Sequence, residues 1–333
     1  MNFDDGKMRR FDFGFQISNF RFWTPDLKKL ALIIFFLSTI VASCGRTASN
    51  AAFTSRPMHV VTDDLGRTVI VPVNITRVVS LAPNLTENIF AVGAGDRLVG
   101  VTTFCNYPEA AKAIAKIGDT MNPNMESIVA LKPDVVFVST ASQIEAFMKT
   151  LEANGIAIYV TNPKSLHDIY QSLIQLGDLF GTRDQAEALV LNLSGRVSLM
   201  SHLVSFVEPR AELKVLPRVF VQISKEPLFT IGKDSFLTQV IKSAYGESVT
   251  ANVETAYPKL SKETALALNP DAIILSNSDD NKEPNEVFKN SPAVKNGRGY
   301  KVNADLLSRP GPRLVDALEQ IARDLHPEKF RNN

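Results

Sequence analysis

Short apolar runs alternate with segments of helical periodicity between residues 77 and 160. The apolar runs have the length of strands and are bounded by Pro, Gly and Asn, which are common in turns. The pattern predicts strands at 77–81, 98–103, 135–139 and 157–160, and helices at 86–93, 125–131 and 143–154. Alternating strands and helices of this kind predict a parallel sheet with helices on its faces.

The same rhythm resumes after Pro217. It predicts strands at 219–222, 272–275 and 299–302, with helices at 235–244, 262–268 and 313–325. Between the two halves, residues 166–180 and 185–207 carry helical periodicity without a strand, and only Gly181 and Thr182 interrupt them. We therefore expect two α/β lobes separated by a long helix, with a small β-hairpin at 59–71 preceding the first lobe.

An internal repeat supports two similar lobes. The pattern E-x-x-x-A-L-x-P-D runs from Glu126 to Asp134 and recurs from Glu263 to Asp271, each time directly before an apolar strand. In each copy the glutamate is expected to lie in the first turn of a helix, and the proline to end that helix.

The N-terminal segment has the pattern of an export signal. Lys28 and Lys29 precede an apolar run at 30–41, which fits the ~7–15 residues of a signal core and is short for the ~20 of a membrane span. The run ends in Val-Ala-Ser-Cys at Cys44, which resembles the lipobox at which a bacterial lipoprotein is diacylated and cleaved. A plain secretory signal or a short anchor helix stays open as an alternative.

These features predict an organisation in five parts. They are a lipoprotein signal at 1–44 ending at Cys44, a flexible tether at 45–57, an N-terminal lobe at 58–164, a helical linker at 165–208 and a C-terminal lobe at 209–333. Cleavage before Cys44, whose sulfur would carry the lipid, would leave Cys105 as the only free cysteine and remove Trp23, the only tryptophan. We therefore expect no disulfide within the mature chain.

Charge and motifs exclude several classes of function. The net charge of +1 over 333 residues does not indicate the basic surface that nucleic-acid binding needs. The four histidines are isolated from one another in sequence, so no metal site is predicted. We find no phosphate-binding loop, nucleophile elbow or zinc-protease motif, and Gly93-Ala94-Gly95 follows a helix instead of opening one. The sequence therefore predicts no catalytic residues, no cofactor and no enzyme.

Four longer motifs resemble one known family. They are R-V-V-S-L-A-P-N-L-T-E at 77–87, V-G-A-G-D-R-L-V-G-V at 92–101, I-V-A-L-K-P-D at 128–134 and L-S-R-P-G-P-R at 307–313. In this order they are similar to the periplasmic substrate-binding proteins of cobalamin and ferric-siderophore ABC importers, and the pattern is nearest to the cobalamin-binding members. The resemblance extends over almost all of residues 63–327.

The resemblance implies an α/β fold of two Rossmann-like lobes joined by a long rigid helix, the helical-backbone type of metal and vitamin receptor. It also implies that Glu126 and Glu263, one on each lobe, dock the protein onto an ABC permease, whose separate ATPase supplies the energy. The expected protein is a monomer outside the cytoplasm, periplasmic or at the cell surface, and held to the membrane by lipid at Cys44.

For the ligand, the resemblance points to loops between the lobes. Phe104, Tyr107, Tyr257 and Arg309 lie in those loops, and aromatic walls with one cation suit a large, flat, partly polar molecule. Tyr257 and Thr120 stand where cobalamin binders tend to have tryptophan, so a cobalamin-like corrinoid is favoured while a ferric siderophore or haem stays open. A surface lipoprotein without a transport role is the alternative from another class.

Overall fold

The computed structural model describes residues 56–140, 144–205 and 216–331. The predicted signal at 1–44, its Cys44, nearly all of the predicted tether and the predicted boundary between residues 208 and 209 lie outside these residues. Within the described ranges, no helix is both long and apolar enough to cross a membrane.

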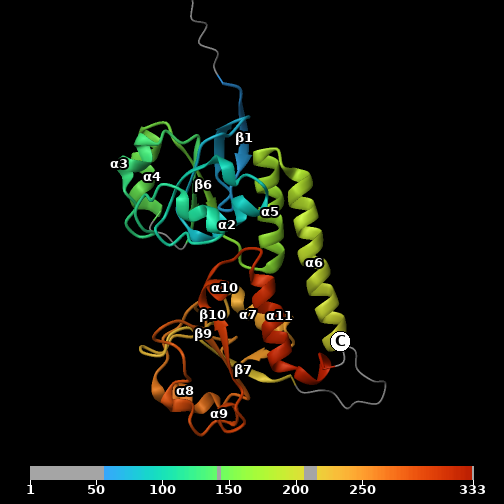
Figure 1. The fold of residues 1–333 in the computed structure, drawn as a ribbon. Coiled ribbons are helices and arrows are strands. Elements are labelled where there is room, and N and C mark those ends of the chain that lie inside the picture. The colour runs from blue at the N-terminus through green and yellow to red at the C-terminus, as the bar shows by residue number, and fades with distance from the viewer. Residues whose placement is uncertain (1–55, 141–143, 206–215, 332–333) are drawn as a thin grey trace, which may run out of the picture. The chain divides into compact units, whose positions relative to one another are not determined.

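Two four-stranded parallel sheets form the centres of the two lobes (Figure 1). The first has the order β4 (Leu98–Val101), β3 (Val78–Ser80), β5 (Val135–Ser139), β6 (Ala157–Thr161). The second has the order β8 (Glu247–Ser248), β7 (Arg218–Gln222), β9 (Ala272–Asn277), β10 (Gly299–Asn303). Numbered within each lobe, both sheets have the order 2-1-3-4, which confirms that the lobes are structural duplicates.

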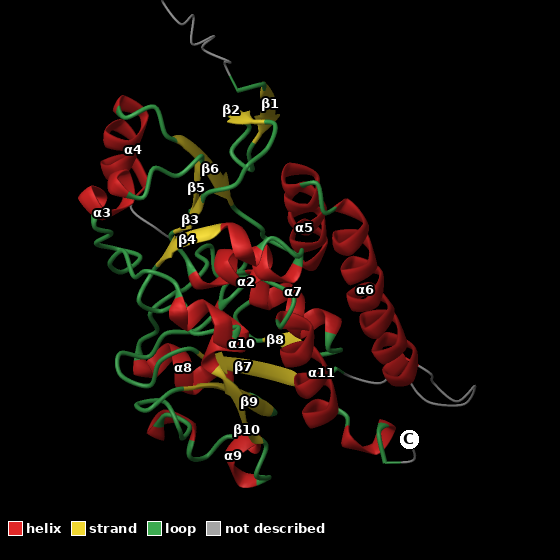
Figure 2. Ribbon diagram, turned by 45° about the horizontal axis from the view of Figure 1, so that its top comes forward, coloured by secondary structure: helices red, strands yellow, loops and turns green. Residues whose placement is uncertain are grey.

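Helices cover both faces of each sheet (Figure 2). The first lobe contains α2 (Pro83–Ala91), α3 (Met125–Ala130), α4 (Ile144–Ala153) and α5 (Leu166–Phe180). The second contains α7 (Phe236–Ser243), α8 (Lys262–Leu268), α9 (Pro292–Lys295), α10 (Ala304–Ser308) and α11 (Leu314–Leu325). Helix α6 (Arg183–Ser205) is the long helix that the sequence predicts.

The alternation of side chains along the strands places each strand between two apolar layers. In β5, Val135 and Phe137 pack into the cluster that includes α2 and α5, whereas Val136 and Val138 pack with Leu151 of α4. All four strand residues are buried, which explains why the strand is a continuous apolar run in the sequence.

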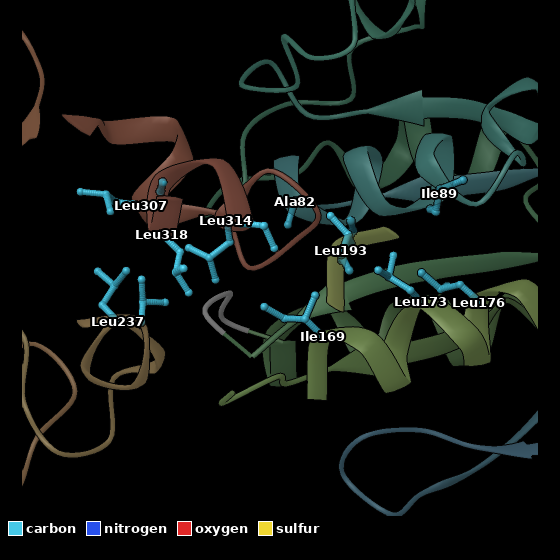
Figure 3. Packing of buried hydrophobic residues seen from close by; sticks show 14 of the residues in the cluster. Ala82, Ile89, Ile169, Leu173, Leu176, Leu193, Leu237, Leu307, Leu314 and Leu318 are labelled. Carbon is cyan, nitrogen blue, oxygen red and sulfur yellow. The ribbon is translucent and has the colours of Figure 1, made fainter. Parts of the chain in front are cut away.

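One apolar core continues from the first lobe into the second (Figure 3). Its buried members come from α2, α5 and α6 as well as from α7, α10 and α11: Ile89, Ile169, Leu173, Leu193, Leu237, Leu307, Leu314 and Leu318. Movement of the lobes apart would expose this shared surface to water at about 25 cal/mol per Å², so the core opposes a large hinge motion.

Helix α6 contacts helices of both lobes. It has 23 residues and is therefore about 35 Å long, and it packs against α5 and α11. Arg196 of α6 binds two carboxylates of α11, Asp316 at 2.6 Å and Glu319 at 2.9 Å. Gly181, with φ of +66°, ends α5 in the left-handed conformation that allows the chain to turn into α6.

The aspartates of the repeated Pro-Asp pair hydrogen-bond the backbone at the start of equivalent strands in the two lobes. Asp134, before β5, accepts hydrogen bonds from the backbone N–H groups of Thr76 and Arg77 at 2.8 and 2.9 Å. Asp271, before β9, accepts one from the N–H of Arg218 at 2.9 Å. Each aspartate therefore holds the start of the neighbouring first strand, β3 or β7, in register.

Hairpin β1 (Met58–Thr62) and β2 (Thr68–Pro72) is antiparallel, as predicted, and is tied to the first lobe. The buried Asp63 accepts hydrogen bonds from the guanidinium of Arg67 and from the N–H of Val160 in β6. The short elements β8, α9 and α10 were not predicted because two to five residues are too few to show a periodic pattern.

Candidate functional site: a cleft between the lobes

A cleft of about 540 Å³ lies where the carboxyl ends of both sheets face each other. This volume is within the range of about 300–1,000 Å³ that is usual for small-molecule sites, and strand ends are where open α/β sheets bind ligands. The first lobe contributes Ala82, Pro83, Asn84, Phe104, Thr120, Ser139, Thr140, Asn162, Pro163 and Lys164; the second contributes Asp234, Ser235, Phe236, Ala256, Tyr257, Asp305, Ser308, Arg309 and Pro310.

Two of the predicted aromatic residues line the cleft from opposite lobes. Phe104 follows β4 and is 60% exposed, and Tyr257 precedes α8 and is 45% exposed. Desolvation in the cleft raises the pKa of Tyr257, so its phenol stays neutral at physiological pH. Thr120 also lines the cleft, together with Phe236, for which the sequence predicts only a place within a helix.

Tyr107 is not among the residues that line the cleft. Its ring lies under the guanidinium of Arg313, with 4.0 Å between the guanidinium carbon and the ring centroid. This is a cation–π contact across the lobes, because Tyr107 follows β4 and Arg313 directly precedes α11. The prediction that Tyr107 contacts the ligand is not tested by this arrangement.

Arg309 lines the cleft, but its charge is balanced by protein carboxylates. It is 7% exposed, and its Nη1 lies 2.7 Å from Glu87 Oε1 on α2 of the other lobe. Its Nη2 lies 2.7 Å from Asp305, and Nη1 also donates to the Asn106 side-chain oxygen at 2.7 Å. The guanidinium is therefore held by both lobes at the base of the cleft.

Glu87 is the centre of this interlobe network. Its buried carboxylate accepts hydrogen bonds from Arg313 Nε at 2.8 Å and Nη2 at 2.6 Å, in addition to Arg309. Between the two arginines, Gly311 passes so close to α2 that a Cβ atom there would lie 2.6 Å from Asn88 Oδ1. The network of Glu87, Arg309, Arg313 and Asp305, which we call the interlobe latch, joins two positive and two negative charges.

The role of Glu87 is not among the predictions from the sequence. A Thr-Glu pair after a proline indicates the start of a helix, and a glutamate there is usually exposed. The signal that could have found it is the pairing of this glutamate with two arginines in L-S-R-P-G-P-R, but their separation of 222 and 226 positions gives no hint of contact.

The rim of the cleft carries polar groups of opposite charge. On the first lobe, Thr140 donates to the side-chain oxygen of Asn162 at 2.7 Å, and Lys164 lies two residues further on. On the second lobe, Asp234 precedes Ser235, whose side chain caps the N-terminus of α7. The amide NH₂ of Asn162 and the two charged groups are available to fix the orientation of a ligand.

The two predicted docking glutamates occupy equivalent positions outside the cleft. Glu126 lies in the first turn of α3, capped by Asn124, and Glu263 lies in the first turn of α8, capped by Ser261. Both are exposed, and within the described residues neither forms an ion pair. The pKa of Glu263 is lowered by hydrogen bonds from its own N–H and from Ser261, so it is charged at neutral pH.

No three His, Cys, Asp or Glu side chains among the described residues are grouped so that they could hold a metal ion. Cys105 is buried beside the hydroxyls of Thr86 and Thr102, each 3.1 Å from its Sγ. The cleft itself offers exposed aromatic surface, amides, hydroxyls and balanced charge, which is a set of groups for binding a molecule.

Two duplicated α/β lobes with a cleft at the carboxyl ends of both sheets define a two-lobe solute receptor. The chain belongs to the periplasmic binding protein family, whose model matches residues 78–304. Members are substrate-binding proteins of ABC importers. They bind small ligands outside the cytoplasm and interact with a permease and its ATPase, and they are not enzymes.

Similar proteins have been described in several bacteria. An uncharacterized ABC transporter substrate-binding lipoprotein of Bacillus subtilis, YvrC, is 30% identical over 88% of this chain and 95% of its own length. A vitamin B12-binding protein of Vibrio vulnificus is 33% identical over 74% of this chain and 89% of its own. The crystal structure of the vitamin B12-binding protein BtuF of Vibrio cholerae matches with a TM-score of 0.65 and 26% identity, over 78% of this chain and 99% of that one.

Proposed function

We propose that this protein captures a cobalamin-like corrinoid in the cleft and delivers it to the permease of an ABC importer. The observation that carries the proposal is the pair of exposed aromatic side chains, Phe104 and Tyr257, that face the cleft from opposite lobes. The names of the Vibrio relatives support the choice of ligand.

The chemistry of the cleft fits a flat macrocycle with polar edges. Covering the exposed parts of Phe104 and Tyr257 would remove about 200 Å² of aromatic surface from water, which is worth about 5 kcal/mol before the costs of binding. A corrin ring carries amide side chains around its edge, and these match the amide and hydroxyl groups of Asn84, Thr140 and Asn162 along the cleft.

The interlobe latch gives the receptor a fixed cleft. Arg309 binds both lobes through Glu87 and Asp305, so it supports the cleft instead of presenting a free positive charge to the ligand. The rigid spacing would also fix the two docking glutamates relative to each other, which a two-point contact with a permease requires. We propose that Glu126 and Glu263 make that contact.

The remaining parts of the proposal concern the N-terminal region. Cleavage before Cys44 and its diacylation would keep the receptor, as a monomer, near the importer through the tether at 45–57. If this is correct, the Cys44→Ser variant moves from the membrane fraction to the soluble extracytoplasmic fraction. Unchanged membrane association of that variant would contradict the lipid anchor without affecting the proposed ligand.

Isothermal titration tests the ligand. The chain from residue 45 onward would be titrated with cyanocobalamin, a ferric hydroxamate, a ferric catecholate and haem, because it has no tryptophan for a fluorescence assay. Tight one-to-one binding of cyanocobalamin alone is the expected result. Tight binding of a siderophore or haem in its place would refute the corrinoid, and no binding of any of the four would favour a non-transport lipoprotein.

The docking proposal has its own test. In cells that depend on this receptor for corrinoid uptake, Glu126→Gln and Glu263→Gln should each reduce uptake, and the double variant should reduce it further. Binding of the ligand by the purified variants should stay unchanged, because both residues lie outside the cleft. Glu187→Gln on the exposed face of α6 is the matched control, and uptake reduced equally by all three changes would contradict the proposal.

A further inference from the structure

We propose that Lys164 binds the anionic group of the ligand and thereby determines which way round the ligand lies in the cleft. The inference rests on the proposed function, because it concerns the same cleft. It departs from the expectation based on sequence, in which Arg309 was the cation that faces the ligand.

Two positively charged side chains line the cleft, and they differ in what surrounds them. The side chain of Arg309 is 8% exposed, and its guanidinium lies 2.7 Å from both Glu87 and Asp305. Its charge is therefore already compensated, and a ligand anion would have to compete with two carboxylates. Lys164 is an exposed residue, and it enters no ion pair with any residue that the structure describes.

The backbone around Lys164 is held firmly. The N–H of Asn162 donates to Asp64 at 2.7 Å, and the N–H of Lys164 donates to Asp168 at 2.9 Å. Ser165 then caps the N-terminus of α5, a helix of 15 residues. The position of the lysine on the cleft wall is thus fixed by the fold, and its long side chain supplies the reach.

The charged side chains that line the two sides of the cleft differ in sign. Asp168 lies in the first turn of α5, where its carboxylate accepts the backbone N–H of Lys164. Asp234 lines the cleft from the other lobe. Since the charges at the base of the cleft balance, the remaining charged side chains that line the cleft are Lys164 on the first lobe and Asp234 on the second. A ligand with one anionic group and several amides would be oriented by this difference.

A phosphodiester is the anion that the proposed ligand carries. Cobalamin contains it in its nucleotide loop, and a lysine ammonium binds such a group as a compact point charge with three donors. Cobinamide has the same corrin ring and amides but lacks the nucleotide loop and its phosphate. The two corrinoids therefore separate binding of the ring from binding of the anion.

Titration of cyanocobalamin and dicyanocobinamide into the native chain and into Lys164→Gln tests the assignment. The native chain should prefer cobalamin. In the variant, the affinity for cobalamin should fall roughly 10–100-fold, the usual worth of a charge-assisted hydrogen bond, while the affinity for cobinamide stays within about twofold. Increasing salt should weaken cobalamin binding by the native chain more than by the variant.

Two further variants act as controls. Lys164→Arg keeps the charge and should retain most of the affinity for cobalamin, and Lys149→Gln removes an exposed charge from α4, away from the cleft lining, and should have no effect. An equal change in the affinities for both corrinoids in Lys164→Gln would overturn the role of the lysine but leave the proposed function intact. Absence of binding by both corrinoids to the native chain would overturn the proposed function and this inference with it.

Discussion

Replacing the buried Glu87 with Gln should destabilise the protein strongly, because Glu87 is the centre of the interlobe latch. The native carboxylate is 3% exposed and accepts three hydrogen bonds of 2.6–2.8 Å from two arginines that belong to the opposite lobe. A glutamine of the same shape keeps one acceptor oxygen but removes the negative charge.

The magnitude follows from the burial of the arginines that remain. Arg309 is 8% exposed and would keep only Asp305 as a directly bonded carboxylate. Arg313, 20% exposed, would lose its only directly bonded carboxylate among the described residues and keep the ring of Tyr107 and the more distant charge of Asp305. Removing one partner of a buried pair costs about 3–5 kcal/mol, because the other charge stays buried without compensation. For a folded region of this size, such a loss lowers the Tm by roughly 6–20 °C.

Thermal unfolding of the chain from residue 45 onward, followed by circular dichroism, measures this shift. Glu187→Gln provides the comparison, since Glu187 pairs with Arg183 at 2.7 Å but both side chains are more than half exposed. An exposed pair of this kind contributes about 0–1 kcal/mol. A decrease in stability below about 1 kcal/mol for Glu87→Gln, or one equal to that of the control, would refute the view that the latch holds the lobes together.

Other predictions follow from single contacts. Asp134→Asn should cost about 1–3 kcal/mol at neutral pH, because the carboxylate holds the N–H of Arg77. Burial raises the pKa of Asp134, but the hydrogen bonds to its carboxylate outweigh burial and lower the pKa overall. The stabilisation by Asp134 is therefore present above the unfolded pKa of about 4 and is lost as the pH falls through the folded pKa. A difference between the urea midpoints of the native chain and the variant that persists at pH 3 would contradict this. Gly232→Ala should destabilise the protein by about 1–3 kcal/mol or more, because the new Cβ would lie 1.9 Å from the carbonyl oxygen of Thr255. Gly195→Ala in α6, where a Cβ meets open space, should stabilise the protein by about 0.5–1 kcal/mol in the same urea titrations.

Much of the fold could be predicted from local patterns. Helix α8 begins and ends where the periodicity placed it, and strand β5 also has the predicted limits. The repeat around Asp134 and Asp271 predicted the duplication, because the motif marks the same junction between helix and strand in each lobe. Helices and strands of this kind depend on residues that are close in sequence, which is why they can be predicted from the sequence.

The organisation of the cleft depended on contacts between distant residues and was only partly predictable. Phe104 and Tyr257 could be chosen because the family resemblance points to the loops after the strands as the ligand site, and both line the cleft. The latch could not be predicted from one sequence, because Glu87 resembles an ordinary residue at the start of a helix, and Arg309 resembles an ordinary cation near a ligand. The fold brings them together and changes the role of each.

The most direct test of capture in the cleft is the affinity of cyanocobalamin for the native chain and for Tyr257→Ala, measured by calorimetry, with Tyr300→Ala on β10 as the matched change outside the cleft lining. Tyr257 presents about 90 Å² of exposed aromatic surface to the cleft, worth about 2 kcal/mol, so its removal should weaken binding by roughly 30-fold. Tyr300→Ala should leave the affinity within a few-fold. Unchanged affinity in Tyr257→Ala, or an equal loss in both variants, would contradict binding at this cleft.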